Sequence, residues 1–162
     1  MVAELTGFEI ANSSLLDEAT AAAEAMAMAH RVSRVSSDRF LVHHDTHPQT
    51  INVLHTRAAP LGLEVVVGDT NDIDESCFGV LLSLPTSTGA VPDWRPAIDK
   101  AHAAGAIVVV VADLLACVLT TPPGQLGADI VVGSAQRFGV PMAFGGPHAA
   151  FIATSETLTR SL

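Results

Sequence analysis

Polar and ionisable residues gather at four points of the sequence where chemistry is possible. They are His43 to His47 (HHDTH), Thr86 to Gly89 (TSTG), Asp113, and Ser134 to Arg137 (SAQR). The first point combines three imidazoles with a carboxylate within five residues, a ligand set that suits a transition metal. Alternate positions on a strand face opposite ways, however, so His43 and His44 do not easily converge on one ion. We therefore favour a strand end with one packed and one solvated histidine, and expect no metal site.

Asp113 ends the most apolar run of the chain, Ala106 to Asp113. A carboxylate placed there is costly to desolvate unless a partner offsets its charge. Two roles are open for it. The carboxylate could cap a helix over Leu114 to Leu119 (LLACVL), or it could be aimed at a cationic ring nitrogen.

Two other kinds of site receive little support. Cys77 and Cys117 lie in apolar runs, so we expect small buried hydrophobic residues rather than nucleophiles. The chain contains neither GxxxxGK[ST] nor a GxGxxG after a first strand, which disfavours a nucleotide-phosphate loop. The glycine-rich stretch follows a late strand instead, from Gly133 to Phe151. Such a loop is entropically costly to order, which suggests that it has a function.

Strands and helices alternate along the chain, and their order predicts the positions of these groups. Runs rich in valine and isoleucine predict strands at 39–44, 63–68, 78–85, 106–113, 127–134 and 148–154. Helices are predicted at 15–32, where Ser14 and Asp17 resemble a capping box, at 48–59, and at 94–105 after an Asp93 cap. A further helix start follows at 155–162. This order predicts a three-layer α/β fold with a mostly parallel sheet, in which ligands bind at the carboxyl ends of the strands.

The composition indicates a chain that packs against another domain or subunit. Apolar residues make up 49% and charged residues 15%, against about a quarter charged in ordinary soluble domains. The net charge of −9 argues against nucleic acid and anionic membranes as partners. The two cysteines form no CxxC pair and fit a reducing compartment, and Glu4 and Glu9 disfavour a signal peptide. The longest apolar stretch is interrupted by Gly105 and Asp113, which disfavours a membrane span.

Four long motifs resemble the glycine-decarboxylating P-protein of the glycine cleavage system, in the same order. They are NSSLLDEATAAAEAMAMA, THPQT, ADLLACVLTTPPGQLGADI and GADIVVGSAQRFGVPMAFGGPHAAFIAT. The resemblance covers essentially the whole chain and matches the amino-terminal half of the long form, or the first subunit of the split form. It implies the aspartate-aminotransferase-like fold of the type I pyridoxal-phosphate (PLP) enzymes. The large domain of that fold has a seven-stranded mixed sheet with one antiparallel strand, for which residues 148–154 are the candidate.

The resemblance also implies a reaction and its partners. The reaction is PLP-dependent decarboxylation of glycine, with transfer of the aminomethyl group to the lipoyl arm of the H-protein. A lysine-bearing second half or subunit of the P-protein is the other implied partner. The implied location is the cytoplasm, or the mitochondrial matrix in a eukaryote. Residues 1–162 would form part of the large domain, with an upstream segment and the small domain absent.

Carried over residue by residue, the resemblance gives three cofactor contacts. Asp113 would pair with the pyridine nitrogen, Thr88 in the polar turn would lie near the ring, and Ser14 would start the helix that holds the phosphate. The position of the Schiff-base lysine holds Gln136. A glutamine amide cannot bond covalently to the cofactor aldehyde, and Lys100, the only lysine, falls within a predicted helix.

Gln136 at this position predicts that the chain is the half of the enzyme that lacks the catalytic lysine and has no catalytic residue of its own. The alternative is a non-catalytic structural subunit that supports the lysine-bearing half. An autonomous binding domain is a third possibility, which the low charge argues against. Arg137 would contact an anionic group across the interface with the second half, or form a salt bridge within the glycine-rich loop.

Overall fold

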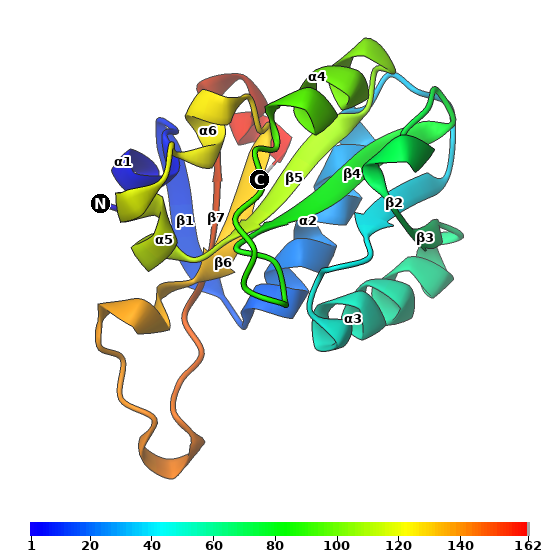
Figure 1. Ribbon diagram of the computed structural model, residues 1–162. Helices are drawn as coiled ribbons and strands as arrows, with labels where there is room; N and C mark the ends of the chain where they lie inside the picture. The colour runs from blue at the N-terminus through cyan, green and yellow to red at the C-terminus, as the bar shows by residue number, and fades with distance from the viewer. Residues whose placement is uncertain (162) are drawn as a thin grey trace.

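Seven strands form one mixed sheet in the order β1-β7-β6-β5-β4-β2-β3. The computed structural model describes residues 1–161, and Figure 1 shows the sheet at its centre. The strands are β1 (Ile10–Leu15), β2 (Arg39–His43), β3 (Glu64–Gly68), β4 (Cys77–Leu84), β5 (Ile107–Ala112), β6 (Ile130–Ser134) and β7 (Ala150–Thr154). Every residue of β4 and β7 is buried, as expected of strands covered on both faces.

Helices cover both faces of the sheet, which confirms the predicted three-layer α/β fold (Figure 1). The helix α2 (Glu18–Val32) and the helix α3 (Pro48–Ala58) pack on one face. The helices of the other layer are α1 (Val2–Thr6), α4 (Arg95–Ala103), α5 (Leu114–Leu119) and α6 (Pro123–Leu126). The face of α2 that meets the sheet is mostly alanine, so the helix lies close to the strands.

The strand β7 is antiparallel to both of its neighbours, β1 and β6, whereas β2 to β6 pair in parallel. This arrangement confirms both the mixed sheet and the predicted antiparallel strand. The structure adds α1 and β1, which no pattern in the sequence predicted. The strand β1 is polar and pairs with a strand about 140 residues later, so local periodicity could not identify it.

The predicted helix start at Ser14 is wrong. Ser14 lies in the edge strand β1, and α2 begins at Glu18 with Asp17 as its N-cap. The capping box is formed by Asp17 and Thr20: the Thr20 N–H donates to Asp17 Oδ1 at 2.7 Å, and the Asp17 N–H donates to Thr20 Oγ1 at 3.1 Å. Pairing with β7 keeps the backbone extended through Leu15, and that extension delays the helix.

Two smaller predictions also need correction. The N-cap of α4 is Trp94 rather than Asp93, although Oδ1 of Asp93 accepts a hydrogen bond from the N–H of Arg95 at 3.2 Å. The helix start predicted at the carboxyl end is a 3₁₀ helix, η5 (Glu156–Ser161), and Leu162 lies outside the described residues. Among the helices of residues 1–161, none has the length and apolar character needed to cross a bilayer.

Candidate functional site

A cavity of about 340 Å³ opens at the carboxyl ends of β4, β5 and β6. The amino ends of α2 and α3 contribute Glu18 and His47 to its wall. The residues that line it are Glu18, His47, Ser83, Leu84, Pro85, Thr86, Ser87, Gly89, Val111, Asp113, Ser134 and Arg137. The cavity lies where a parallel sheet is expected to bind its ligands, and each of the four predicted polar groups contributes to it, the first through His47 alone.

Asp113 is held by two contacts within this chain. Its Oδ1 accepts a hydrogen bond from the N–H of Leu115 at 2.9 Å, so the carboxylate caps α5. Its Oδ2 accepts a hydrogen bond from Nε of Arg137 at 3.0 Å and forms an ion pair with Nη2 at 2.8 Å. The capping role is therefore confirmed, whereas the salt bridge of Arg137 is formed with Asp113, outside the glycine-rich loop in which it was expected. The positive charge that faces Asp113 belongs to the protein itself.

Asp45 accepts hydrogen bonds from the polar turn that follows β4. The carboxylate of Asp45 accepts hydrogen bonds from the Ser87 hydroxyl, from the Thr88 N–H at 3.1 Å and from Thr88 Oγ1 at 2.5 Å. These hydrogen bonds keep the pKa of Asp45 well below its usual range. Thr86 and Ser87 line the cavity, whereas the hydroxyl of Thr88 is directed to Asp45. The role of Thr88 near a ring stays a prediction.

Gln136 ties together the two ends of the glycine-rich loop. Its Nε2 donates to the carbonyl of Pro147 at 3.1 Å, and its N–H donates to Oγ of Ser134 at 3.2 Å. Figure 1 shows the loop, residues 139–149, projecting from the body of the molecule in orange. Met142 and Phe144, near the tip, have strongly exposed side chains. At the predicted lysine position the chain thus has a residue that organises a loop.

Glu18 is the residue of the cavity that sequence reasoning missed. Burial raises the pKa of its carboxyl; His47 opposes this effect, while Asp113 and Asp17 reinforce it. The carboxylates of Asp17 and Glu18 occupy the positive end of α2, where an anionic ligand would otherwise be favoured. The sequence did contain a signal for this residue, because Asp17 and Glu18 stand at the start of the alanine-rich helix. Ser14 is not among the lining residues, so its predicted contact with a phosphate stays a prediction without support from its position.

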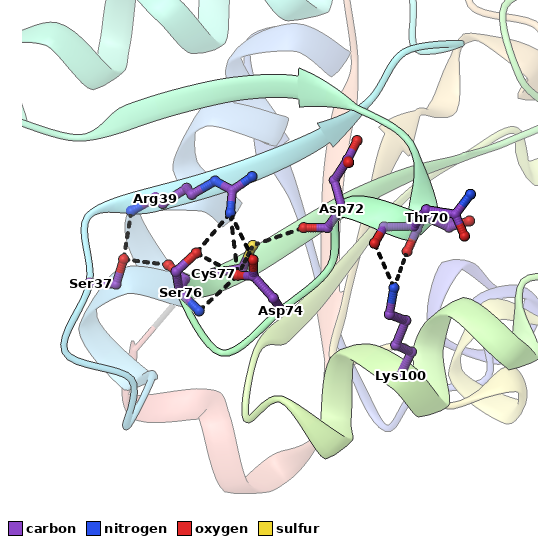
Figure 2. A network of polar contacts seen from close by, with 9 residues as sticks. Ser37, Arg39, Thr70, Asp72, Asp74, Ser76, Cys77 and Lys100 are labelled. Carbon is purple, nitrogen blue, oxygen red and sulfur yellow. Dashed lines mark hydrogen bonds and ion pairs between the residues drawn. The ribbon is translucent and has the colours of Figure 1, made fainter.

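Lys100 lies away from the cavity, on α4 (Figure 2). Its Nζ donates to the carbonyls of Thr70 at 3.0 Å and Asn71 at 2.8 Å. These two residues belong to the short 3₁₀ helix η2 (Thr70–Asp72), which follows β3. The only lysine therefore has a structural position, as its predicted place within a helix suggested.

The two histidines at the end of β2 lie closer together than we expected. The premise that His43 and His44 face opposite ways is wrong, since their ring centroids are 4.3 Å apart. His43 is the last residue of the strand and His44 already belongs to the following turn, so the alternation of strand side chains ends between them. Asp69 lies beside them, and ligand atoms of the three residues lie within 4.8 Å of one another.

Both cysteines are buried, as predicted. Burial raises the pKa of the Cys117 thiol to about 11, and the charge of Asp113 adds to this effect. A thiol with this pKa is a poor nucleophile at neutral pH.

The residues that line the cavity, and Gln136 next to Arg137 in the sequence, do not fit PLP as a covalently held group. Gln136 offers no amine, and Asp113 already faces the guanidinium of Arg137. Asp17 and Glu18 place two carboxylates at the helix end where a phosphate would sit. The charges of Asp113 and Arg137 in this cavity are therefore already paired with each other.

Comparison with known proteins gives one consistent family. A family model described as "Glycine cleavage system P-protein" matches residues 1–162. The glycine dehydrogenase (decarboxylating) of Nostoc punctiforme is 57% identical over 162 residues, which are 99% of this chain and 16% of that protein. The enzyme of the same name from Bradyrhizobium diazoefficiens is 57% identical over 164 residues, 100% of this chain and 17% of that protein. The chain thus spans about a sixth of the length of these relatives.

Solved structures agree with this match. A crystal structure of glycine decarboxylase (P-protein) of the glycine cleavage system, in inhibitor-bound form, superposes with a TM-score of 0.90 at 38% identity. The match covers 99% of this chain and 38% of that one. Cystathionine gamma-lyase from Lactobacillus plantarum matches with a TM-score of 0.77 at 17% identity, over 99% of this chain and 42% of that one. At that identity the likeness concerns the fold alone, which is that of the type I PLP enzymes.

Proposed function

The chain belongs to the glycine cleavage system P-protein family, and from this we propose that it is a non-catalytic part of a glycine dehydrogenase (decarboxylating). The complete protein would decarboxylate glycine and transfer the aminomethyl group to the lipoyl group of the H-protein. Within it, residues 1–162 would form part of a large domain of the fold type I architecture.

One observation carries the proposed role of this segment. Identity of 57% to named relatives runs along nearly the whole chain, yet the position that resembles the Schiff-base lysine holds Gln136, and Asp113 in the cavity is paired with Arg137. A covalent cofactor site would need an amine and an unpaired carboxylate at these positions. Family membership supports the activity of the complete protein. The chemistry of the cavity favours a non-catalytic, supporting role for residues 1–162.

We propose that PLP is bound by residues of the complete protein that lie outside this chain. The cofactor would supply a cationic ring that accepts the electron pair released when carbon dioxide leaves glycine. No step of that reaction is assigned to residues of this chain. Its contribution is to hold a rigid sheet and to present the glycine-rich loop.

Exposed apolar side chains support a lysine-bearing second half or subunit as the partner of this surface. Leu119 on α5 is 86% exposed, and the side chains of Met142 and Phe144 in the loop are exposed as well. Together with the low share of charged residues, these side chains favour burial against another part of the protein. The lipoylated H-protein is the second proposed partner, and a cytoplasmic location and a role in glycine catabolism belong to the same proposal.

A purely structural subunit is the second candidate, and Gln136 is the observation that favours it. The two candidates differ in whether the polypeptide that carries this segment also carries the catalytic lysine. Assay of the complete purified protein with carboxyl-labelled glycine and lipoylated H-protein tests the activity. We expect release of labelled carbon dioxide; a polypeptide that releases none alone, but does so after a lysine-bearing subunit is added, is the structural subunit. Absence of release under both conditions would contradict the proposed function.

A further inference from the structure

A second group of side chains lies at the neighbouring edge of the sheet, outside the cavity. His43 is the last residue of β2, His44 follows it, and Asp69 follows the end of β3. None of the three lines the cavity of about 340 Å³. We infer that His43, His44 and Asp69 bind one divalent transition metal ion.

The pairing of two parallel strands brings these residues together. His43 lies opposite Gly68 in the register of β2 and β3, and the N–H of His44 donates to the carbonyl of Gly68 at 2.8 Å. His44 and Asp69, which directly follow β2 and β3, are therefore neighbours and candidate ligands. Nδ1 of His44 lies 3.7 Å from Oδ2 of Asp69.

The carboxylate of Asp69 is oriented by the turn that it begins. Its Oδ1 accepts hydrogen bonds from Oγ1 of Thr70 at 3.1 Å and from the N–H of Asn71 at 3.4 Å, which leaves Oδ2 toward His44. The main-chain N–H of Asp69 donates to Oδ2 of Asp72 at 2.8 Å. Figure 2 shows Lys100 donating to two main-chain carbonyls of the same turn. Ligand carboxylates fixed by outer contacts of this kind are typical of metal sites.

Both imidazoles would bind the metal through Nδ1. Nδ1 of His43 accepts a hydrogen bond from the N–H of Asp45 at 3.3 Å, so its lone pair is unprotonated, and a metal would replace this long contact. The ring of His43 packs edge-on against Trp94 at 4.9 Å, which fixes its orientation. Nδ1 of His44 lies 3.3 Å from the carbonyl of Gly68 and 3.7 Å from Oδ2 of Asp69, so a metal beside Asp69 would meet this nitrogen, with the ring proton on Nε2.

The donor set selects the class of metal. Two imidazoles and a carboxylate suit Zn²⁺, Co²⁺, Ni²⁺ or Cu²⁺ better than Mg²⁺ or Ca²⁺, which prefer oxygen ligands alone. With metal–ligand bonds of about 2.1 Å, donors of a tetrahedral site lie roughly 3.4 Å apart. The ligand atoms lie within 4.8 Å of one another, so side-chain movements that shorten these distances by at most about 1.4 Å would form the site. His44 and Asp69 have room for this movement because their side chains are 57% and 49% exposed. Three protein ligands leave a position for water.

Metal titration of the complete protein tests the site. The chelator-treated protein is dialysed against Zn²⁺, and the bound equivalents and their affinity are compared among the wild type and the variants His44→Asn, Asp69→Asn and His55→Asn. Asparagine retains the capping role of residue 69, so Asp69→Asn removes the ligand charge and preserves the turn. His55, an exposed histidine on α3, serves as the matched control.

We expect His44→Asn and Asp69→Asn each to lower the affinity of one Zn²⁺ site at least about tenfold. Loss of a residue that only supports a ligand already lowers metal affinity by about this factor. His55→Asn should bind as the wild type does. Equal binding by all four proteins would overturn the inference, and so would an equal loss in His55→Asn. A loss confined to one of the two ligand variants would overturn the three-ligand site. None of these outcomes depends on glycine turnover, so the inference and the proposed function stand or fall separately.

Discussion

The side chain of Arg137 places Nη2 2.8 Å and Nε 3.0 Å from Oδ2 of Asp113. Asp113 ends the buried strand β5, and Arg137 lies in η3 (Ala135–Phe138), which begins the glycine-rich segment. The pair joins the ends of two strands across the cavity. It gives the carboxylate a permanent positive partner, so the position that resembles a cofactor contact is satisfied without a ligand.

Removal of this ion pair should have a small effect on stability. The side chain of Arg137 is 60% exposed, and ion pairs at such positions contribute about 1 kcal/mol or less. We therefore expect Arg137→Met to lower the midpoint of urea unfolding only slightly, and by more than Arg95→Met does. Arg95 pairs with Asp93 at 2.9 Å on the surface and is the matched control.

The two roles of Asp113 can be separated by a pair of variants. Asp113→Asn retains an oxygen for the N–H of Leu115, whereas Asp113→Ala removes the cap of α5 as well. Loss of an N-cap costs about 1 kcal/mol. We expect hydrogen exchange of the α5 peptides to accelerate roughly fivefold more in Asp113→Ala than in Asp113→Asn, which is what about 1 kcal/mol implies. Equal exchange in the two variants would show that the cap is not what holds α5.

Much of this architecture follows from local sequence patterns, and the exceptions have physical reasons. Valine-rich runs such as β5 predicted the buried strands because burial on both faces demands continuous apolar residues. The strand β1 escaped notice because its partner lies at the other end of the chain. The motif from Ser14 to Asp17 resembled a capping box, but strand pairing outweighed it.

The candidate site shows the same division. Asp113 was predicted to face the site because it ends a buried strand, and the structure places it in the wall of the cavity. The partnership with Arg137 joins residues 24 positions apart and depends on the path of the chain after β6. Likewise, the proximity of His43 and His44 depends on where β2 ends, a boundary that periodicity defines poorly.

Glu18 should make the start of α2 sensitive to pH. Its pKa is raised by burial, so above the ordinary value of 4.5 the unfolded state releases its proton before the folded state does. The folded state then binds more protons, and stability falls as pH rises through that window. Below the ordinary pKa both states are protonated and the effect vanishes.

Hydrogen exchange of the α2 peptides in Glu18→Gln checks this sign. We expect the variant to exchange more slowly than the wild type at pH 7 and at the same rate at pH 4. Faster exchange in the variant at pH 7 would mean that the ionised carboxylate stabilises the helix end more than burial destabilises it.

Cys117 should resist alkylation in the folded protein. A pKa of about 11 in place of 9.0 reduces the thiolate fraction at pH 8 about a hundredfold. We expect mass spectrometry after iodoacetamide treatment to find Cys117 unmodified in the native protein and modified in urea. Rapid native labelling of the Cys117 peptide, with the protein still folded, would show that the thiol is not buried as described.

Borohydride reduction of the complete protein with PLP, followed by peptide mapping, tests the central claim most directly. The experiment uses the wild type and Gln136→Lys, because the variant restores an amine at the position that resembles the catalytic lysine. We predict no stoichiometric adduct within residues 1–162 of either protein, since Asp113 stays paired with Arg137 and Glu18 stays at the start of α2. A stoichiometric adduct at Lys100 in the wild type, or at residue 136 in the variant, would contradict the account and show a cavity ready for the cofactor.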